Sequence, residues 1–295
     1  MTAVVVVAAT ALAGLALRHR GRTAHRPSDT TYSVPLPAAS PQPAAGSPRP
    51  APGGRVTCPP GDGGPLRRDT QFTDVAGNVV HYSISLPADY YTACKRYPVI
   101  YALHGKTQDN VVFMDEALSM RRAMAAGVLD QAVIVTPDGY STGRWENLAT
   151  GPAEDDVIRR LIPFVERTYR VVPGGSYRLL VGFSMGGHGA LRFGLKYPTM
   201  FAAVWSVDGA MGATEDYLPF VQGRSSGDFR IIAAGGRLNG DRVRALVDGL
   251  GRRGIVIPYI YQDLDHEFVA FVDADGKGGW QAMRYLQQNL GRVMP

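Results

Sequence analysis

The chain has 295 residues, which is enough for one large domain or two small ones, and its apolar content of 45% is ordinary for a globular protein. Its net charge of +5 is unevenly distributed. Residues 1–68 carry eight Arg against Asp29 and Asp62, a net of +6, whereas the other 23 basic and 24 acidic residues give −1. The basic character therefore belongs to the N-terminal tail, and nothing in the rest of the chain indicates a nucleic-acid partner.

The N-terminal segment begins with an uncharged run at residues 3–17. This run is short for a membrane span and suits the apolar region of a secretory signal, so residues 1–22 are predicted to be a signal peptide or membrane anchor. Arg18, Arg20 and Arg22 follow the run directly, an arrangement that favours keeping the following chain in the cytoplasm. A wrongly assigned start codon would also explain it. We expect an extracytoplasmic protein, secreted or tethered to a membrane through this segment.

Residues 23–68 are predicted to be a disordered linker. The stretch 23–65 is rich in Pro, Ala, Gly and Ser and holds 11 of the 21 prolines. Cys58 lies near its end, and the only other cysteine is Cys94. In an exported protein these two residues would form a disulfide, whereas the alternative is two free thiols. Cys and His show no metal-ligand spacing, and we expect no cofactor.

Residues 69–295 are predicted to form one domain in which strands and helices alternate. An Ala-Gly-Asn turn separates two strands of a hairpin, and continuous apolar runs predict the buried strands that follow. Strands are expected at 71–75, 79–86, 98–103, 132–136, 201–207, 229–234 and 255–261, and helices at 115–127, 154–169, 241–253 and 279–290. This alternation predicts an α/β fold, with one mostly parallel sheet covered by helices on both faces.

The most informative stretch is Gly182-Phe183-Ser184-Met185-Gly186, which follows an apolar run and precedes apolar residues at helical spacing. Gly-x-Ser-x-Gly between a strand and a helix is the nucleophile elbow of the α/β-hydrolase fold. A serine in this strained turn projects its Oγ away from the backbone, and the two glycines are needed because strand and helix pass close together. The alternative is a glycine-rich turn in which the serine only caps the helix.

A nucleophilic serine needs a base, and in this fold the order along the chain is serine, acid, histidine. His266 is the one histidine well downstream of Ser184, in a short loop after the last predicted strand, and is predicted to be the base. His188 lies four residues along the elbow helix, where a side chain packs or faces solvent.

The acid that would orient His266 is predicted to be Asp241, the first carboxylate after the strand at 229–234. Asp241 could instead complement the dipole of the following helix. Asp208, which follows the preceding strand, is the alternative acid. Asp265 adjoins His266 in sequence, which is a poor geometry for orienting the ring.

The oxyanion hole requires two converging backbone N–H groups. Met185 follows the nucleophile and is predicted to supply one. Lys106, in the loop after the strand at 98–103, is predicted to supply the other, and His104 is expected to shape that loop.

Several motifs together resemble a known family. They are Tyr101-Ala102-Leu103-His104-Gly105, Pro137-Asp138-Gly139, residues 154–171 and Gly182-Phe183-Ser184-Met185-Gly186-Gly187. Over roughly residues 70–290 the chain is similar to the esterase D-type "putative esterase" family of α/β-hydrolases. That family includes S-formylglutathione hydrolases, feruloyl and enterochelin esterases, and mycolyltransferases. One departure is that family members often carry Gly-x-x-Asp or Gly-x-x-Glu after the strand, where this chain has Gly235-Gly236-Arg237-Leu238.

These residues predict a serine carboxylesterase acting through an acyl-enzyme on Ser184. The segment 208–228 is too short for a separate cap domain, so we expect no large lid and an open site for a small-molecule or polymer-borne ester. Tyr140, Trp145 and Trp280 are candidates to line it. One alternative is an acyltransferase of the mycolyltransferase type, which passes the acyl group to a sugar or lipid hydroxyl. The other is a non-catalytic binding module that has lost its acid, an alternative kept open by Leu238.

Overall fold

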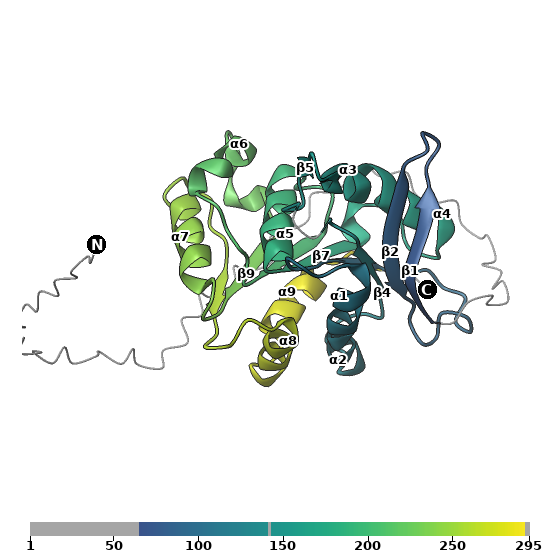
Figure 1. Ribbon diagram of the computed structural model, residues 1–295. Coiled ribbons are helices and arrows are strands. Elements are labelled where there is room, and N and C mark those ends of the chain that lie inside the picture. The colour runs from purple at the N-terminus through teal and green to yellow at the C-terminus, as the bar shows by residue number, and fades with distance from the viewer. Residues whose placement is uncertain (1–64, 141–142, 293–295) are drawn as a thin grey trace, which may run out of the picture. The chain divides into compact units, whose positions relative to one another are not determined.

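The computed structural model describes residues 65–140 and 143–292, which form an eight-stranded sheet flanked by helices (Figure 1). The strand order is β1-β2-β4-β3-β7-β8-β9-β10. The pairs β1–β2 and β2–β4 are antiparallel, and every later pair in the sheet is parallel. The strands are β1 Leu66–Thr73, β2 Val79–Ser85, β3 Val99–Leu103, β4 Val133–Pro137, β7 Arg178–Phe183, β8 Ala203–Val207, β9 Ile231–Gly235 and β10 Tyr259–Tyr261.

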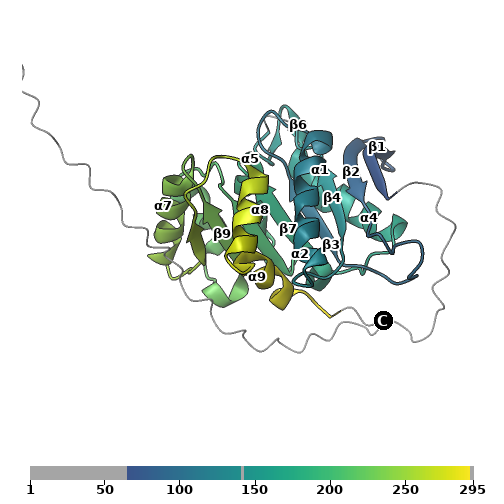
Figure 2. The same ribbon diagram turned by 90° about the horizontal axis from the view of Figure 1, so that it is seen from below.

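Helices cover both faces of this sheet (Figures 1 and 2). One face carries α1 Asn110–Ala117, α2 Arg121–Ala125, α8 Phe268–Lys277 and α9 Gln281–Asn289. The other face carries α3 Ala153–Asp155, the π-helical segment η2 Asp156–Leu161, α4 Ile162–Thr168, α5 Met185–Lys196 and α7 Gly240–Gly251. A short pair, β5 Asn147–Leu148 and β6 Gly151–Pro152, is antiparallel and separate from the main sheet.

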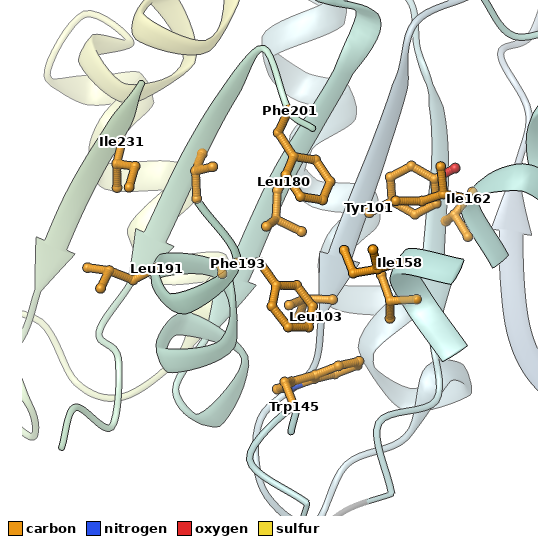
Figure 3. Close-up of a cluster of buried hydrophobic side chains, with 14 of the residues drawn as sticks. Tyr101, Leu103, Trp145, Ile158, Ile162, Leu180, Leu191, Phe193, Phe201 and Ile231 are labelled. Carbon is orange, nitrogen blue, oxygen red and sulfur yellow. The ribbon is translucent and has the colours of Figure 1, made fainter. Parts of the chain in front are cut away.

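The buried side chains form two cores because successive residues of a strand point to opposite faces. On β3, Tyr101 and Leu103 join one core, and Ile100 and Ala102 join the other. Figure 3 shows the first core, where Phe193 of α5 and Ile158 of η2 lie over the strand residues. The central strands are buried on both faces, which explains why they appear in the sequence as largely apolar runs.

The predicted fold class is confirmed: the sheet is mostly parallel and helices surround it. Some boundaries differ from the prediction. The strand expected at 255–261 is limited to β10, and the helix expected at 154–169 consists of α3, η2 and α4 in succession. Helix α8 was not predicted, because its Phe-Val-Ala-Phe-Val start has no polar face to give helical periodicity.

Three expectations concern residues outside the described ranges: the leader at 1–22, most of the linker at 23–68, and Cys58. Cys94 is disulfide-bonded, whereas its pairing with Cys58 stays a prediction. Among the helices that the structure does describe, none combines the length and the apolar character of a membrane span.

Candidate active site

Ser184 lies at the turn between β7 and α5, in the strained backbone that the elbow motif predicts. Its φ of 56° and ψ of −115° are in a region that a residue with a side chain rarely adopts. Hydrogen bonds hold the turn in place: the Ser184 N–H donates to the Val207 carbonyl at 3.0 Å, and the Ser184 carbonyl accepts from Ala210 at 2.9 Å. The strain is therefore opposed by bonds to the end of the neighbouring strand β8.

The two glycines of the motif are required by close backbone contacts. A Cβ on Gly182 would lie 2.0 Å from the Gly186 carbonyl oxygen, and a Cβ on Gly186 would lie 2.0 Å from the Leu103 carbonyl oxygen. Backbone atoms cannot move aside as a flexible side chain can. The steric reason given for the motif in the sequence is therefore confirmed at both positions.

His266 contacts Ser184 from the loop that precedes α8. Its Nε2 lies 2.8 Å from Ser184 Oγ, and its Nδ1 lies 2.5 Å from Asp208 Oδ2. The ring packs on Phe183, with the ring centroids 4.5 Å apart. The serine is half-buried and the His266 side chain is 26% exposed, whereas Asp208 is fully buried. Hydrogen bonds thus link the three side chains in a row, from the buried carboxylate of Asp208 to the partly exposed hydroxyl of Ser184.

The two contacts of the His266 ring determine where its proton lies. An ionised carboxylate only accepts hydrogen bonds, so Nδ1 must carry the proton that faces Asp208. In the neutral ring, Nε2 is then unprotonated and accepts from the Ser184 hydroxyl. This tautomer is the one in which a histidine can take a proton from a nucleophile.

Asp208 is held by the turn that follows β9. Its Oδ1 accepts from the N–H groups of Gly236 at 2.8 Å and Asn239 at 3.2 Å. The Asn239 side chain donates to the Asp208 carbonyl oxygen at 2.9 Å. Asp208 itself has a φ of 41°, a strained value for a residue with a side chain. Both ends of the residue are thus fixed, and Oδ2 is directed to His266.

The position predicted for the acid is wrong. Asp241 is exposed in the first turn of α7, a place where a carboxylate complements the helix dipole, and the carboxylate at His266 is that of Asp208. The turn after β9 does reach the site, but it supplies N–H groups to Asp208 instead of a carboxylate. Asp265, also considered in the sequence, pairs with Arg237 at 2.8 Å.

The loop after β3 also lies against Ser184. A Cβ on Gly105 would lie 3.4 Å from the Ser184 Cβ, so Lys106 follows a residue in direct contact with the elbow. Met185 is the first residue of α5 and is buried, whereas Lys106 is exposed. The structure therefore places both predicted oxyanion donors on segments that contact Ser184, while their role stays a prediction.

His104 shapes this loop, as the sequence predicted. Its Nε2 accepts from the Gly139 N–H at 2.8 Å, so Nδ1 of the neutral ring carries the proton and donates to the Gly105 carbonyl at 2.8 Å. Trp145 donates its indole N–H to the His104 carbonyl at 3.1 Å and is fully buried. Trp145 therefore supports this loop from within the buried hydrophobic cluster (Figure 3).

The other candidate residues also have structural partners. Tyr140 donates its hydroxyl to Asp156 at 2.6 Å, and Trp280 packs at the start of α9. His188 is buried, with Nδ1 2.6 Å from the Tyr217 hydroxyl and Nε2 3.3 Å from Glu146. His188 thus packs within the fold, one of the two positions expected for it.

Two residues near the site, Gln108 and Glu116, belong to no sequence motif and were not predicted as site residues. The Gly105 N–H donates to Gln108 Oε1 at 2.8 Å, and Gln108 Nε2 donates to Glu116 Oε1 at 2.5 Å. Burial raises the pKa of Glu116, and the nearby Glu267 carboxylate adds to this effect. In the described ranges, no group of three or more His, Cys, Asp or Glu side chains is placed to hold a metal ion.

The segment between β8 and β9 is short, as predicted. It holds the 3₁₀ turn η4 Thr214–Asp216, helix α6 Leu218–Val221 and the 3₁₀ turn η5 Ser226–Asp228. In Figure 1, α6 lies on the same side of the sheet as α5 and α7. No separate cap domain is inserted at this point of the described chain.

Similar solved structures have the same fold at low sequence identity. A ferulic acid esterase is 22% identical, with a TM-score of 0.65 over 76% of this chain and 98% of that one. An S-formylglutathione hydrolase from Staphylococcus aureus is 16% identical, with a TM-score of 0.55 over 72% and 94%. A ferulic acid esterase from Anaeromyces mucronatus is 19% identical, with a TM-score of 0.54 over 79% and 94%. These likenesses show the fold.

Sequence comparisons identify the family. Esterase Rv1288 of Mycobacterium tuberculosis (strain ATCC 25618 / H37Rv) is 33% identical over 140 residues, which are 46% of this chain and 30% of that protein. Esterase MT1326 of the strain CDC 1551 / Oshkosh gives the same values. The chain thus matches only about 30% of the length of these relatives. The profile of the Esterase family, described as "Putative esterase", matches residues 74–222, about half of the chain, including Ser184 and Asp208. The chain therefore belongs to the Esterase family of α/β-hydrolases.

Proposed function

We propose that this protein is a serine carboxylesterase that hydrolyses an ester through an acyl-enzyme on Ser184. The observation that carries the proposal is the continuous contact from Ser184 Oγ through His266 to Asp208, at 2.8 and 2.5 Å. A serine hydroxyl becomes an effective nucleophile when a correctly oriented histidine can take its proton. The non-catalytic alternative depended on a missing acid, and the carboxylate of Asp208 at His266 argues against it.

In the acylation step, Ser184 Oγ attacks the ester carbonyl carbon as its proton passes to His266 Nε2. Asp208 holds the opposite Nδ1–H and stabilises the imidazolium that forms. Met185, at the N-terminus of α5, and Lys106 donate their backbone N–H groups to the carbonyl oxygen as it becomes negative. The tetrahedral intermediate then collapses, the C–O bond to the alcohol breaks, and His266 returns the proton to the leaving alkoxide.

Deacylation repeats these steps with water as the nucleophile. His266 takes a proton from the water as its oxygen attacks the acyl carbonyl, and the Ser184 Oγ–acyl bond breaks as the proton is returned to Oγ. An alcohol in place of water would give transfer to a new ester, the acyltransferase alternative. Product analysis with and without an added alcohol acceptor distinguishes hydrolysis from transfer.

The substrate class that fits best is an ester with an accessible carbonyl, either small or carried on a polymer. Two features support this: the short segment between β8 and β9, and the fold shared with ferulic acid esterases and an S-formylglutathione hydrolase. p-Nitrophenyl acetate and methyl ferulate are suitable first substrates, since they differ in the size of the acyl group.

The experiment that tests the proposal compares the wild-type protein with Ser184→Ala. We expect the wild type to react covalently with a fluorophosphonate probe and to hydrolyse p-nitrophenyl acetate. Ser184→Ala should lose labelling and lower kcat by about 10⁴-fold or more, because the members of such a triad act as a unit. Hydrolysis at the wild-type rate by Ser184→Ala would overturn the proposal.

A further inference from the structure

The loop that carries Lys106 is fixed by a side chain outside the Ser184–His266–Asp208 chain. Gln108 lies half-buried between β3 and α1, and Glu116 lies half-buried on α1. The backbone N–H of Gly105 donates to Gln108 Oε1 at 2.8 Å, and Gln108 Nε2 donates to Glu116 Oε1 at 2.5 Å. Because a backbone N–H can only donate, the amide oxygen of Gln108 must face Gly105, and its NH₂ group then faces Glu116.

The carbonyl of Gly105 is fixed as well. It accepts from His104 Nδ1 at 2.8 Å and from the Gln108 N–H at 3.4 Å. This carbonyl and the N–H of Lys106 belong to the same peptide group, which is trans because the described chain has no cis peptide bond. In a trans peptide the C=O and N–H point in opposite directions. Holding the Gly105 carbonyl therefore also sets the direction of the Lys106 N–H.

Gly105 is in close contact with both Gln108 and the nucleophile. A Cβ at this position would lie 2.9 Å from Gln108 Oε1 and 3.4 Å from the Ser184 Cβ. A small rotation of the His104–Gly105 peptide, whose N–H donates to Gln108, would turn Gly105 and therefore change the position of the Lys106 N–H relative to the reacting carbonyl. Stabilisation of an oxyanion depends on donors that are already oriented before the charge develops.

We propose that Gln108, itself oriented by Glu116, is a positioning residue: its side chain holds the N–H of the His104–Gly105 peptide, fixes Gly105, and so sets the orientation of the following Gly105–Lys106 peptide that the oxyanion hole needs. The inference rests on the proposed esterase function, since it concerns the same site. Gln108 acts through the backbone and does not touch the substrate. Its contribution appears in the transition state, so kcat changes and KM does not.

The first test is Gln108→Ala, with kcat and KM for p-nitrophenyl acetate measured beside the thermal midpoint. We expect kcat to fall by about 10- to 100-fold, since a misplacement of about 1 Å in a catalytic group has an effect of that size. KM should stay within about threefold. Gln71→Ala is the matched control, because Gln71 is exposed on β1 and loses the same atoms. Wild-type kcat in Gln108→Ala would overturn the inference.

The second test exchanges the two hydrogen-bonding groups. Gln108→Glu places two carboxylates at the distance of a hydrogen bond, where they repel each other, so kcat should fall. Adding Glu116→Gln restores a donor facing a carboxylate: residue 108 still accepts from Gly105 and now also accepts from the amide at 116. The double variant should recover at least about tenfold of the kcat lost in Gln108→Glu. A double variant no more active than the single variant would contradict the inference.

Ser184→Ala, assayed in parallel, distinguishes failure of the positioning role of Gln108 from failure of the esterase proposal. Loss of activity in Ser184→Ala with wild-type kcat in Gln108→Ala would refute only the positioning role. Activity retained in Ser184→Ala would refute the esterase proposal itself. If Gln108→Ala lowers the thermal midpoint below the assay temperature, the comparison of Gln108→Glu with the double variant tests the positioning role instead, because the double variant keeps both hydrogen bonds.

Discussion

Replacing Asp208 with Asn should invert the protonation of His266 without changing the shape of the site. Asp208 Oδ1 accepts from two N–H groups, those of Gly236 and Asn239, which can only donate. The single oxygen of an Asn side chain must therefore stay with them, and its NH₂ group must face His266 Nδ1. Nδ1 then has to accept, so the proton moves to Nε2, where it faces Ser184 and prevents the ring from acting as a base.

The expected size of the effect is a fall in kcat of about 10⁴-fold, the value typical of the wrong histidine tautomer in a serine triad. At about 1.36 kcal/mol for each factor of ten, this is about 5.5 kcal/mol of transition-state stabilisation. Stability should change little, because Asn keeps both N–H contacts and fills the same volume. The assay is p-nitrophenyl acetate hydrolysis, with the thermal midpoint measured on the same samples.

Asp241→Asn is the control, since Asp241 is exposed on α7 and the substitution is chemically identical. It should leave kcat within about twofold of the wild type, as expected for a surface change away from the site. A kcat within tenfold of the wild type in Asp208→Asn, or a collapse in Asp241→Asn, would refute the reasoning.

Two further predictions concern stability. Gly186→Ala should prevent stable folding or lower the thermal midpoint by more than about 10 °C, because the added Cβ would lie 2.0 Å from the Leu103 carbonyl oxygen. A thermal midpoint within about 3 °C of the wild type, measured by circular dichroism, would contradict this prediction. Glu154 is buried, and although burial alone would raise its pKa, hydrogen bonds from Lys196, Tyr197 and Arg192 lower the pKa overall. A lowered pKa stabilises the fold above the unfolded value of about 4.3, and this stability is lost as pH falls through the folded pKa. Glu154→Gln should therefore lower the free energy of unfolding by about 2 kcal/mol at pH 7 and by less in acid. Urea denaturation measures this, and an equal loss at about pH 7 and about pH 3 would argue against a lowered pKa of Glu154 in the folded protein.

Much of the fold and part of the site follow from local sequence. Buried parallel strands need mostly apolar residues on both faces, so β3 appears as an unbroken apolar run, and β4, β7 and β8 as apolar runs with one polar or charged residue each. The elbow is equally local, because Gly182 and Gly186 are each required by backbone atoms within a few residues or on the adjoining strand. His266 could be assigned because chain order leaves one histidine in the right place.

The acid could not be assigned in this way. The choice between Asp208 and Asp241 depends on which of two neighbouring turns directs a carboxylate to His266. That direction is set by contacts across the sheet, from Gly236 and Asn239 to Asp208, about 30 residues apart in sequence. The Gln108–Glu116 pair was missed for a similar reason: neither residue stands in a motif, and their contact appears only when α1 packs beside the β3 loop.

Ser184 directly follows β7 and Asp208 directly follows the neighbouring strand β8, and backbone hydrogen bonds join Ser184 to residues 207 and 210, whereas His266 lies in a later part of the chain. Between Asp208 and His266 in the sequence, at Gly223, the chain makes an exposed turn with a φ of 72° and no atom within 4 Å of where a Cβ would be. A chain divided at this turn would carry serine and acid on one fragment and the base on the other. Neither fragment alone would hold Ser184, Asp208 and His266 together, so ester hydrolysis by a mixture of the two fragments would report their reassembly.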